Sequence, residues 1–146
     1  MKIEVFALCD AATDSMGKLN ILGTFDTIYA HQMPAVHPQC AVAMRVRVTR
    51  IEKGEHRIKI NIVDQDGKAV VPSLDTSMQV LFPDEQPSHA FNIILNMQGL
   101  KLEKHGEYSI DLAIDGRQEA SLPLFVKDPP QNPAAPPELP SGPEPL

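Results

Sequence analysis

Residues 44–48 read Met-Arg-Val-Arg-Val, and residues 58–62 read Ile-Lys-Ile-Asn-Ile. In both stretches an apolar residue alternates with a polar one. This alternation is typical of β-strands that bury one face, because successive side chains of a strand point to opposite sides. Similar short runs, separated by turn residues, continue from Met1 to about Val126. The pattern predicts an all-β protein.

The region holds seven or eight such runs and no convincing helix. Short strands in this number and at this spacing predict a single antiparallel β-sandwich of immunoglobulin-like character. Tyr108 stands just after Gly106 at the start of a late strand. It resembles the tyrosine corner of such sandwiches, and the alternative is an ordinary tyrosine at the edge of the core.

The N-terminal third predicts three further features. Residues 3–9 are apolar on both parities, as expected of a strand covered on both faces. Residues 10–17 predict a polar loop, and residues 18–30 a long strand in which Gly23 indicates a bulge or a close backbone approach. Cys9 and Cys40 both lie in apolar runs, which predicts two reduced, buried thiols in a cytoplasmic protein, with a disulfide as the alternative.

Composition divides the chain and limits its partners. Of 14 prolines, eight fall in residues 129–146, which predicts a folded domain at 1–126 and a disordered Pro-rich tail at 127–146. The tail is expected to be a solubilising tail or linker, or else a docking peptide for an SH3-type groove. A net charge of −6 argues against a nucleic-acid partner. No apolar run is long enough for a membrane span or a signal-peptide core, so we expect a cytoplasmic protein without a membrane partner.

Residues 40–51 and 55–64 are expected to form a hairpin. The valines of the first run and the isoleucines of the second must share the buried face, so a three-residue loop at 52–54 is required. That register pairs Val48 with Ile58 and Val46 with Ile60.

The same register sets like charges opposite one another on the outer face of the hairpin. Arg47 then lies opposite Lys59, with Arg45 and Arg57 beside them, and such pairs are destabilising. Acidic residues on a neighbouring strand, or solvent, would offset the repulsion. The alternative is that Arg45, Arg47, Arg57 and Lys59 form a binding face for an anionic partner.

Motifs with a specific chemistry are lacking. Residues 64–67 begin like a calcium loop but do not continue as one, so Asp66-Gly67 predicts a two-residue hairpin turn that pairs Ile62 with Val71. His31, His37 and Cys40 match no zinc spacing. The chain contains neither a P-loop nor a Gly-x-Ser-x-Gly elbow. We therefore predict no catalytic residues, no cofactor and no metal.

Several short motifs together resemble a family of small uncharacterised bacterial proteins over about the first 125 residues. The resemblance implies a bacterial, cytoplasmic β-sandwich with no assigned activity and no catalytic residues to carry over. The motifs are Cys9-Asp10, Gly17-Lys18-Leu19-Asn20, Gly23-Thr24-Phe25-Asp26, Pro34, His37-Pro38 and Asp64-Gln65-Asp66-Gly67-Lys68.

The sequence as a whole predicts a non-enzymatic binding or accessory module, with a protein as the expected partner and an anionic ligand as the alternative. Two other classes stay open. An enzyme would assemble its site across the loops, in a pocket that holds two titratable groups within hydrogen-bond reach. A structural homo-oligomer would form through an open strand edge.

Overall fold

The computed structural model describes residues 1–82, 85–131, 136, 140 and 142, and most of the predicted Pro-rich tail lies outside them. The protein is all-β, as predicted, and the only helical element of the described residues is a short 3₁₀ turn, η1. The described strands are more numerous than the seven or eight expected. They are β1 (Lys2–Ser15), β2 (Lys18–Thr24), β3 (Thr27–Tyr29), β4 (Ala35–Thr49), β5 (Gly54–Val63), β6 (Leu74–Val80), β7 (Ser88–Leu102), β8 (Gly106–Ile114) and β9 (Arg117–Lys127).

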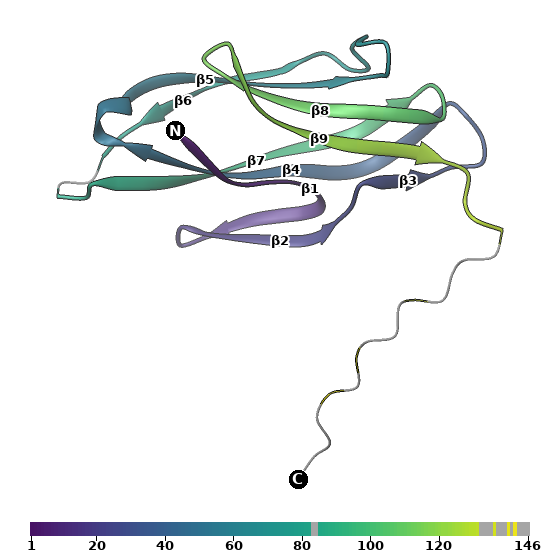
Figure 1. Cartoon of the computed structure of the whole chain (residues 1–146), viewed down its shortest axis with the longest axis horizontal. Helices are drawn as coiled ribbons and strands as arrows, with labels where there is room; N and C mark the ends of the chain where they lie inside the picture. The colour runs from purple at the N-terminus through teal and green to yellow at the C-terminus, as the bar shows by residue number, and fades with distance from the viewer. Residues whose placement is uncertain (83–84, 132–135, 137–139, 141, 143–146) are drawn as a thin grey trace.

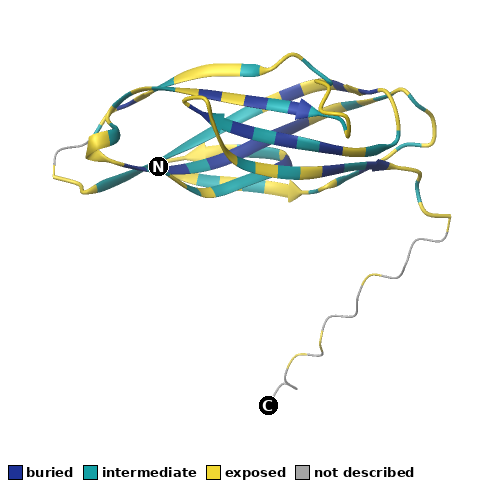
Figure 2. Cartoon of the chain, turned by 45° about the horizontal axis from the view of Figure 1, so that its top comes forward, coloured by how far each residue is buried: buried dark blue, intermediate teal, exposed yellow. Residues whose placement is uncertain are grey.

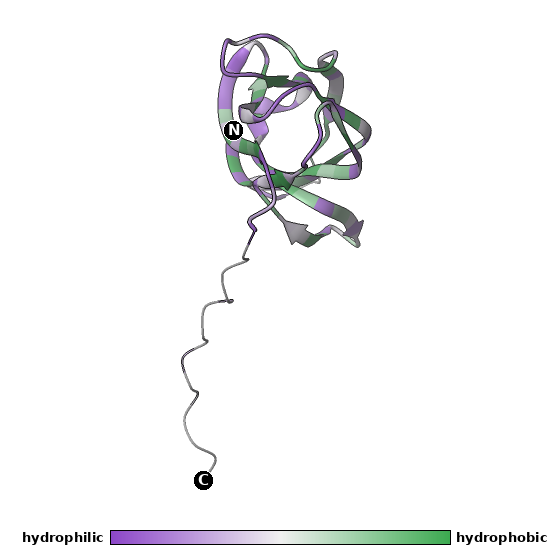
Figure 3. Ribbon diagram, turned by 90° about the vertical axis from the view of Figure 1, so that its right-hand side faces the viewer, coloured by the Kyte–Doolittle hydropathy of each residue, from purple (hydrophilic) through white to green (hydrophobic). Residues whose placement is uncertain are grey.

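The strands form two sheets that curve around a common core (Figures 1 and 3). The four-stranded sheet has the order β2-β1-β4-β7, and the five-stranded sheet has the order β3-β9-β8-β5-β6. All neighbours are antiparallel except β3 and β9, which are parallel. The expectation of a purely antiparallel fold is therefore wrong at this short pair.

The alternating residues of β4 and β5 build the centre of the core. Val42, Met44 and Val46 are completely buried on one face of β4, and Ile58 and Ile60 are buried from the facing sheet. Buried and exposed residues alternate along the ribbons in Figure 2, as the period-two pattern predicts.

The predicted hairpin between β4 and β5 does not form. β4 pairs with β1 and β7 in one sheet, whereas β5 pairs with β6 and β8 in the other. The 3₁₀ turn η1 (Arg50–Glu52) carries the chain across the core from one sheet to the other. Val48 and Ile58 are both fully buried in the common core, but they lie in opposite sheets and are not neighbours in one.

β1 turns back on itself near its middle (Figure 1). Its first half pairs with β4 as far as Cys9, and its second half pairs with β2. Residues 10–24, which we name the arm, fold over the outer sides of β4 and β7 and cover Cys9, Ala41 and Ala43. The segment predicted as a polar loop at 10–17 is therefore mostly strand. The predicted close approach at Gly23 is confirmed, because its φ is +67° and a Cβ there would lie 2.5 Å from the carboxylate of Asp10.

The sequence also predicts a last hairpin around Asp115-Gly116, and the two predicted Asp-Gly turns have opposite outcomes. Asp115 and Gly116 both have positive φ and close the β8–β9 hairpin, as expected of a type I′ turn. At Asp66-Gly67 only the glycine has positive φ, and the residues that follow form an isolated bridge between Val63 and Ala69 where a paired strand was expected. Tyr108 is buried, and its hydroxyl donates to the carbonyl of Lys104 at 2.5 Å.

Candidate functional site

The four basic residues predicted to share one face lie on two different sheets. Arg45 and Arg47 are on β4, whereas Arg57 and Lys59 are on β5. The predicted common face is wrong because it depended on the hairpin that does not form. Each pair has its own acidic neighbour. For Arg57 and Lys59 this neighbour is Asp75 of β6. Arg57 donates two hydrogen bonds to Asp75, at 2.8 and 3.0 Å, and Lys59 lies opposite Asp75 in the pairing of β5 with β6.

Glu4 lies between the two arginines of β4. Its carboxylate accepts hydrogen bonds from Arg45 at 3.1 Å and from Arg47 at 2.8 and 3.3 Å. The hydrogen bond from Arg47 is the main cause that lowers the pKa of Glu4. Arg45 also donates to the carbonyl of Gly17 at 3.2 Å, and Asn92 donates to Asp14 at 2.9 Å. The cluster is an internal network that fastens the tip of the arm to the sheet.

A histidine and three carboxylates, those of Glu52, Asp115 and Glu119, line a pocket of about 360 Å³. His56 Nδ1 is 2.6 Å from Asp115 Oδ2, and this hydrogen bond is the main cause that raises the pKa of His56. His56 Nε2 contacts the backbone carbonyl of Glu52. Both ring nitrogens face hydrogen-bond acceptors, so neither is free to face a substrate while these two contacts are kept.

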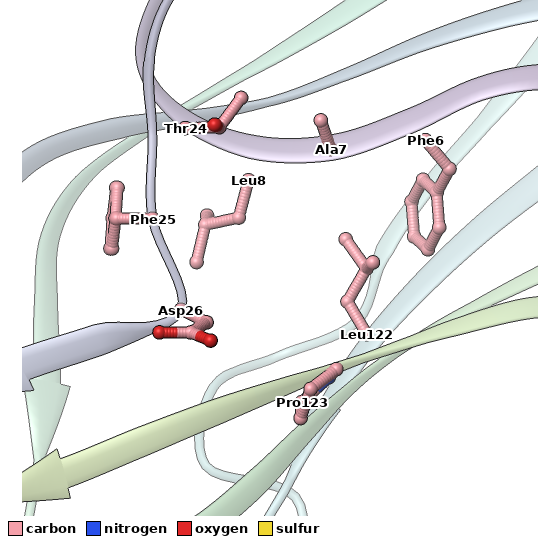
Figure 4. Close-up of a pocket in the computed structure, with 8 residues that line it drawn as sticks. All are labelled: Phe6, Ala7, Leu8, Thr24, Phe25, Asp26, Leu122 and Pro123. Carbon is pink, nitrogen blue, oxygen red and sulfur yellow. The ribbon is translucent and has the colours of Figure 1, made fainter. Parts of the chain in front are cut away.

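A larger pocket, of about 560 Å³, lies where the two sheets meet along the first half of β1 and the strand β9 (Figure 4). We name it the seam pocket. It is bounded by Phe6, Ala7 and Leu8 of β1, by Thr24, Phe25 and Asp26 of the β2–β3 crossing, and by Leu122 and Pro123 of β9.

The crossing from β2 to β3 closes one end of the seam pocket. The Phe25 N–H donates to the Leu8 carbonyl at 3.1 Å, and the Asp26 carbonyl accepts the Phe125 N–H at 2.7 Å. One short segment thus joins the edge of one sheet to the edge of the other. In Figure 4 the side chains of Phe6, Leu8 and Leu122 occupy the space between β1 and β9, and the Asp26 carboxylate lies at its rim.

The β1 side of the seam keeps unpaired main-chain groups. In an antiparallel strand the N–H and C=O of a residue point to the same side, and the direction reverses with each residue. The Leu8 carbonyl points into the seam toward Phe25, so the N–H and C=O of Phe6 also point there. Within the described part of the chain, no backbone hydrogen bond reaches these two groups of Phe6.

The β9 side of the seam is chemically different. The Phe125 N–H points toward β3, so the nitrogen of Pro123, two residues earlier, faces the seam. Proline has no N–H, and it is found at the edges of sheets because it cannot donate to an added strand. At the seam, β1 can therefore form main-chain hydrogen bonds with an added strand, whereas β9 offers no N–H at Pro123.

Sequence reasoning missed the seam pocket. Pro123 inside an otherwise regular strand is the signal for an edge strand, and the doubly apolar run around Phe6 is the signal for a strand covered on both faces. Neither signal indicates that these two strands lie beside each other, because they are more than a hundred residues apart.

The remaining sequence candidates are dispersed. The His37 ring contacts Phe25, and His31 lies 3.7 Å from the carboxylate of Asp128. Cys40 is buried on the core face of β4. In the part of the chain that the structure describes, no group of three or more His, Cys, Asp and Glu side chains is placed to hold a metal ion.

Comparisons with known proteins give the chain a family but no activity. Within the described residues no helix is both long and apolar enough to cross a bilayer. A search of curated proteins finds no relative. A family model described as "Family of unknown function (DUF6941)" matches residues 4–127, which covers nearly the whole folded region. The chain therefore belongs to the DUF6941 family of unknown function.

Proposed function

We propose that the protein is a non-enzymatic binding module that accepts an extended segment of a partner protein in the seam pocket. The main support is the unpaired N–H and C=O of Phe6, which point into a mainly apolar pocket. Main-chain groups at a sheet edge are matched by another main chain, and a neighbouring pocket then selects a side chain of the bound segment.

The lining of the seam pocket suggests the sequence of the bound segment. Phe6, Leu8 and Leu122 favour one large aliphatic or aromatic side chain as the anchor. The exposed carboxylate of Asp26 at the rim favours a Lys or Arg next to that anchor. Because Pro123 of β9 has no N–H to donate, the segment would form its main-chain hydrogen bonds with β1.

A display library of extended peptides, selected against the full chain, tests this proposal. We expect enrichment of peptides with one large apolar residue beside a basic residue. Thr24→Phe, at the wall of the pocket, should weaken the enriched peptides at least about tenfold in fluorescence anisotropy. Thr76→Phe, at an exposed position of β6, is the matched control and should leave binding unchanged. Failure to enrich any peptide, or equal binding to the Thr24→Phe variant, would refute the proposal.

The proposal includes two finer features of the fold and its location. We propose an immunoglobulin-like sandwich, which the tyrosine-corner contact of Tyr108 supports. We also propose a cytoplasmic protein, which the free thiols of Cys9 and Cys40 support. The two thiols lie on opposite faces of the four-stranded sheet, a placement that does not favour a disulfide between them.

The enzyme alternative would use the pocket of His56 and Asp115, since it brings two titratable groups within hydrogen-bond reach. We favour the binding module because the second nitrogen of His56 faces the carbonyl of Glu52. An enzyme at this site would need the ring to leave that carbonyl before it could act as a base.

A further inference from the structure

β7 presents a long free edge on the side of the molecule away from the seam. Among the described strands its only partner is β4, so its other side is unpaired along most of its length. Such an edge displays a row of free N–H and C=O groups, which makes it a template for a further strand.

The direction of these free groups follows from the registers. The Leu8 carbonyl points away from β4, so Val42, opposite Leu8, directs its main-chain groups toward β7. Val42 is opposite Leu95, and the N–H and C=O of Leu95 are therefore used by β4. The alternate residues of β7 point their main-chain groups outward, and these are Ala90, Asn92, Ile94, Asn96 and Gln98.

The other free edges carry features that discourage pairing. Pro123 interrupts β9, and a register shift between Ile3 and Val5 distorts the free part of β1. β2 and β6 are only seven residues long, and they carry Lys18 and Asp75 respectively. Short strands, charges, bulges and prolines are the usual protections of a sheet edge.

β7 carries none of these protections over residues 88–98, which contain no Pro, Gly, Asp, Glu, Lys or Arg. The core-facing side chains of Phe91, Ile93 and Leu95 are only half-buried there, although they pack against the core. A long, neutral and largely apolar free edge of this kind is expected to be covered in the working protein.

The sequence of the edge is complementary to itself. If two copies of β7 run antiparallel with Ile94 opposite Ile94, then Asn96 lies opposite Asn92, whose amide is already held within its own copy by Arg45, Asp14 and the carbonyl of Gly17. On the other face Phe91 lies opposite Met97, and Ile93 opposite Leu95. Apolar side chains thus pair with apolar ones, no like charges meet, and the outward main-chain groups of both copies face each other.

We propose that two copies of this chain pair through β7 about a two-fold axis at Ile94, which joins their four-stranded sheets into one continuous sheet. A two-fold interface is the commonest in homo-oligomers because one surface patch serves both copies. The interface lies at the opposite side of the sandwich from the seam pocket, so it does not depend on the proposed peptide binding.

Sedimentation velocity over about 1 to 100 μM tests the wild-type chain, because mass action shifts a monomer–dimer equilibrium across such a range. We expect a species of twice 16.0 kDa that dissociates on dilution. A monomer at every concentration would overturn the proposal.

Three substitutions locate the interface. Asn96→Pro removes one outward N–H and should raise the dimer dissociation constant at least about tenfold. Asn96→Thr keeps the N–H in a strand-favouring residue and should leave the dimer intact. The matched control is Ser77→Pro on β6, in the other sheet. The carbonyl of Arg57 points away from β6, toward Asp115 in the β8–β9 turn, so the N–H of Ser77, which lies opposite Arg57, points outward from the sheet edge. A dimer that survives Asn96→Pro, or that is lost with Ser77→Pro, would contradict a β7 interface.

Hydrogen exchange on the wild-type protein decides the question even if a proline variant fails to fold. In a monomer the amides of Asn92, Ile94 and Asn96 exchange quickly, whereas those of Ile93 and Leu95 are protected by β4. In the proposed dimer both sets are protected, and the protection of the first set falls on dilution. A dimer that leaves the first set unprotected would overturn the proposal, because its interface would lie elsewhere.

Discussion

The two faces of β4 are both buried, but in different ways. On the core face Val42, Met44 and Val46 are completely inaccessible and pack against side chains of the opposite sheet. On the outer face Ala41 and Ala43 are equally inaccessible, but they are covered by the arm. Large side chains fill a space between two sheets, whereas small ones let a second layer of chain approach closely.

The outer face changes character further along the strand. After Ala43 the outward residues are Arg45 and Arg47, which pair with Glu4 and hold the tip of the arm. One strand therefore carries a hydrophobic core on one side, and on the other a small apolar cluster followed by an ionic network. Complete burial in this protein therefore has two origins, which mutations can separate.

Met44→Ala tests the core face and should give the largest effect. Removing a fully buried Met side chain leaves a cavity between the sheets, and we expect a loss of about 2–5 kcal/mol in the free energy of unfolding. Urea denaturation measures it. Met16→Ala is the matched control, because Met16 is 99% exposed at the tip of the arm and its truncation should be neutral. Equal effects at the two positions would contradict this assignment of the core.

Ala43→Leu tests the outer face. The larger side chain has no room beneath the arm, so we expect a destabilisation of about 1–3 kcal/mol by the same measurement. Ala113→Leu introduces the same side chain on the outer face of β8, at a half-buried position that belongs to neither buried cluster, and should change stability by less than about 0.5 kcal/mol. An unaffected Ala43→Leu variant would show that the arm does not rest on this face in solution.

His56→Gln tests the ionic contact between the η1 turn and the β8–β9 turn. The pKa of His56 is raised above 6.5 in the folded protein, mainly by the hydrogen bond to Asp115. The protonated ring therefore stabilises the fold fully below pH 6.5, and this contribution is lost as the pH rises through the folded-state pKa. Thermal unfolding at several pH values should show the largest difference between wild type and variant near pH 5.5, and a smaller one above pH 8. A difference that grows with pH would refute the assignment.

Glu4→Gln tests the network that fastens the arm, and its effect should be the smallest because the network is accessible to solvent. The pKa of Glu4 is lowered from 4.5, so its ionised form stabilises the fold above that pH, and the contribution disappears as the pH falls through the folded-state pKa. The variant should unfold at a slightly lower urea concentration than wild type at pH 7 and at the same concentration near pH 3. Added salt should also reduce the difference. A difference that persists at pH 3 would point to packing as its cause.

The sequence predicts the class of the fold and the buried face of each strand well. The alternation around Met44 and Ile60 depends on local geometry alone, because side chains of a strand alternate whatever its neighbour is. The placement of Tyr108 and the turn at Asp115-Gly116 are local in the same way. Features that depend on a few adjacent residues are therefore recovered.

The pairing of strands was predicted less well, because apolar alternation records only that a face is buried. Val48 and Ile58 can be buried equally well as neighbours in one sheet or as residues of two sheets that pack together. The predicted common face of the four basic residues was wrong for this reason, since Arg47 and Lys59 lie on different sheets. The arm was missed because it packs through few apolar residues, such as Leu19 and Ile21, and its remaining residues are mostly polar.

The two buried thiols can report two different opening motions of the protein. Cys9 is sealed by the arm, whereas Cys40 is sealed by the facing sheet, and burial raises the pKa of Cys40 to about 11. A thiol reagent therefore reaches Cys9 when the arm lifts and reaches Cys40 only when the two sheets part. The ratio of the labelling rates of Cys9 and Cys40 therefore reports how often the arm detaches while the two sheets stay packed together.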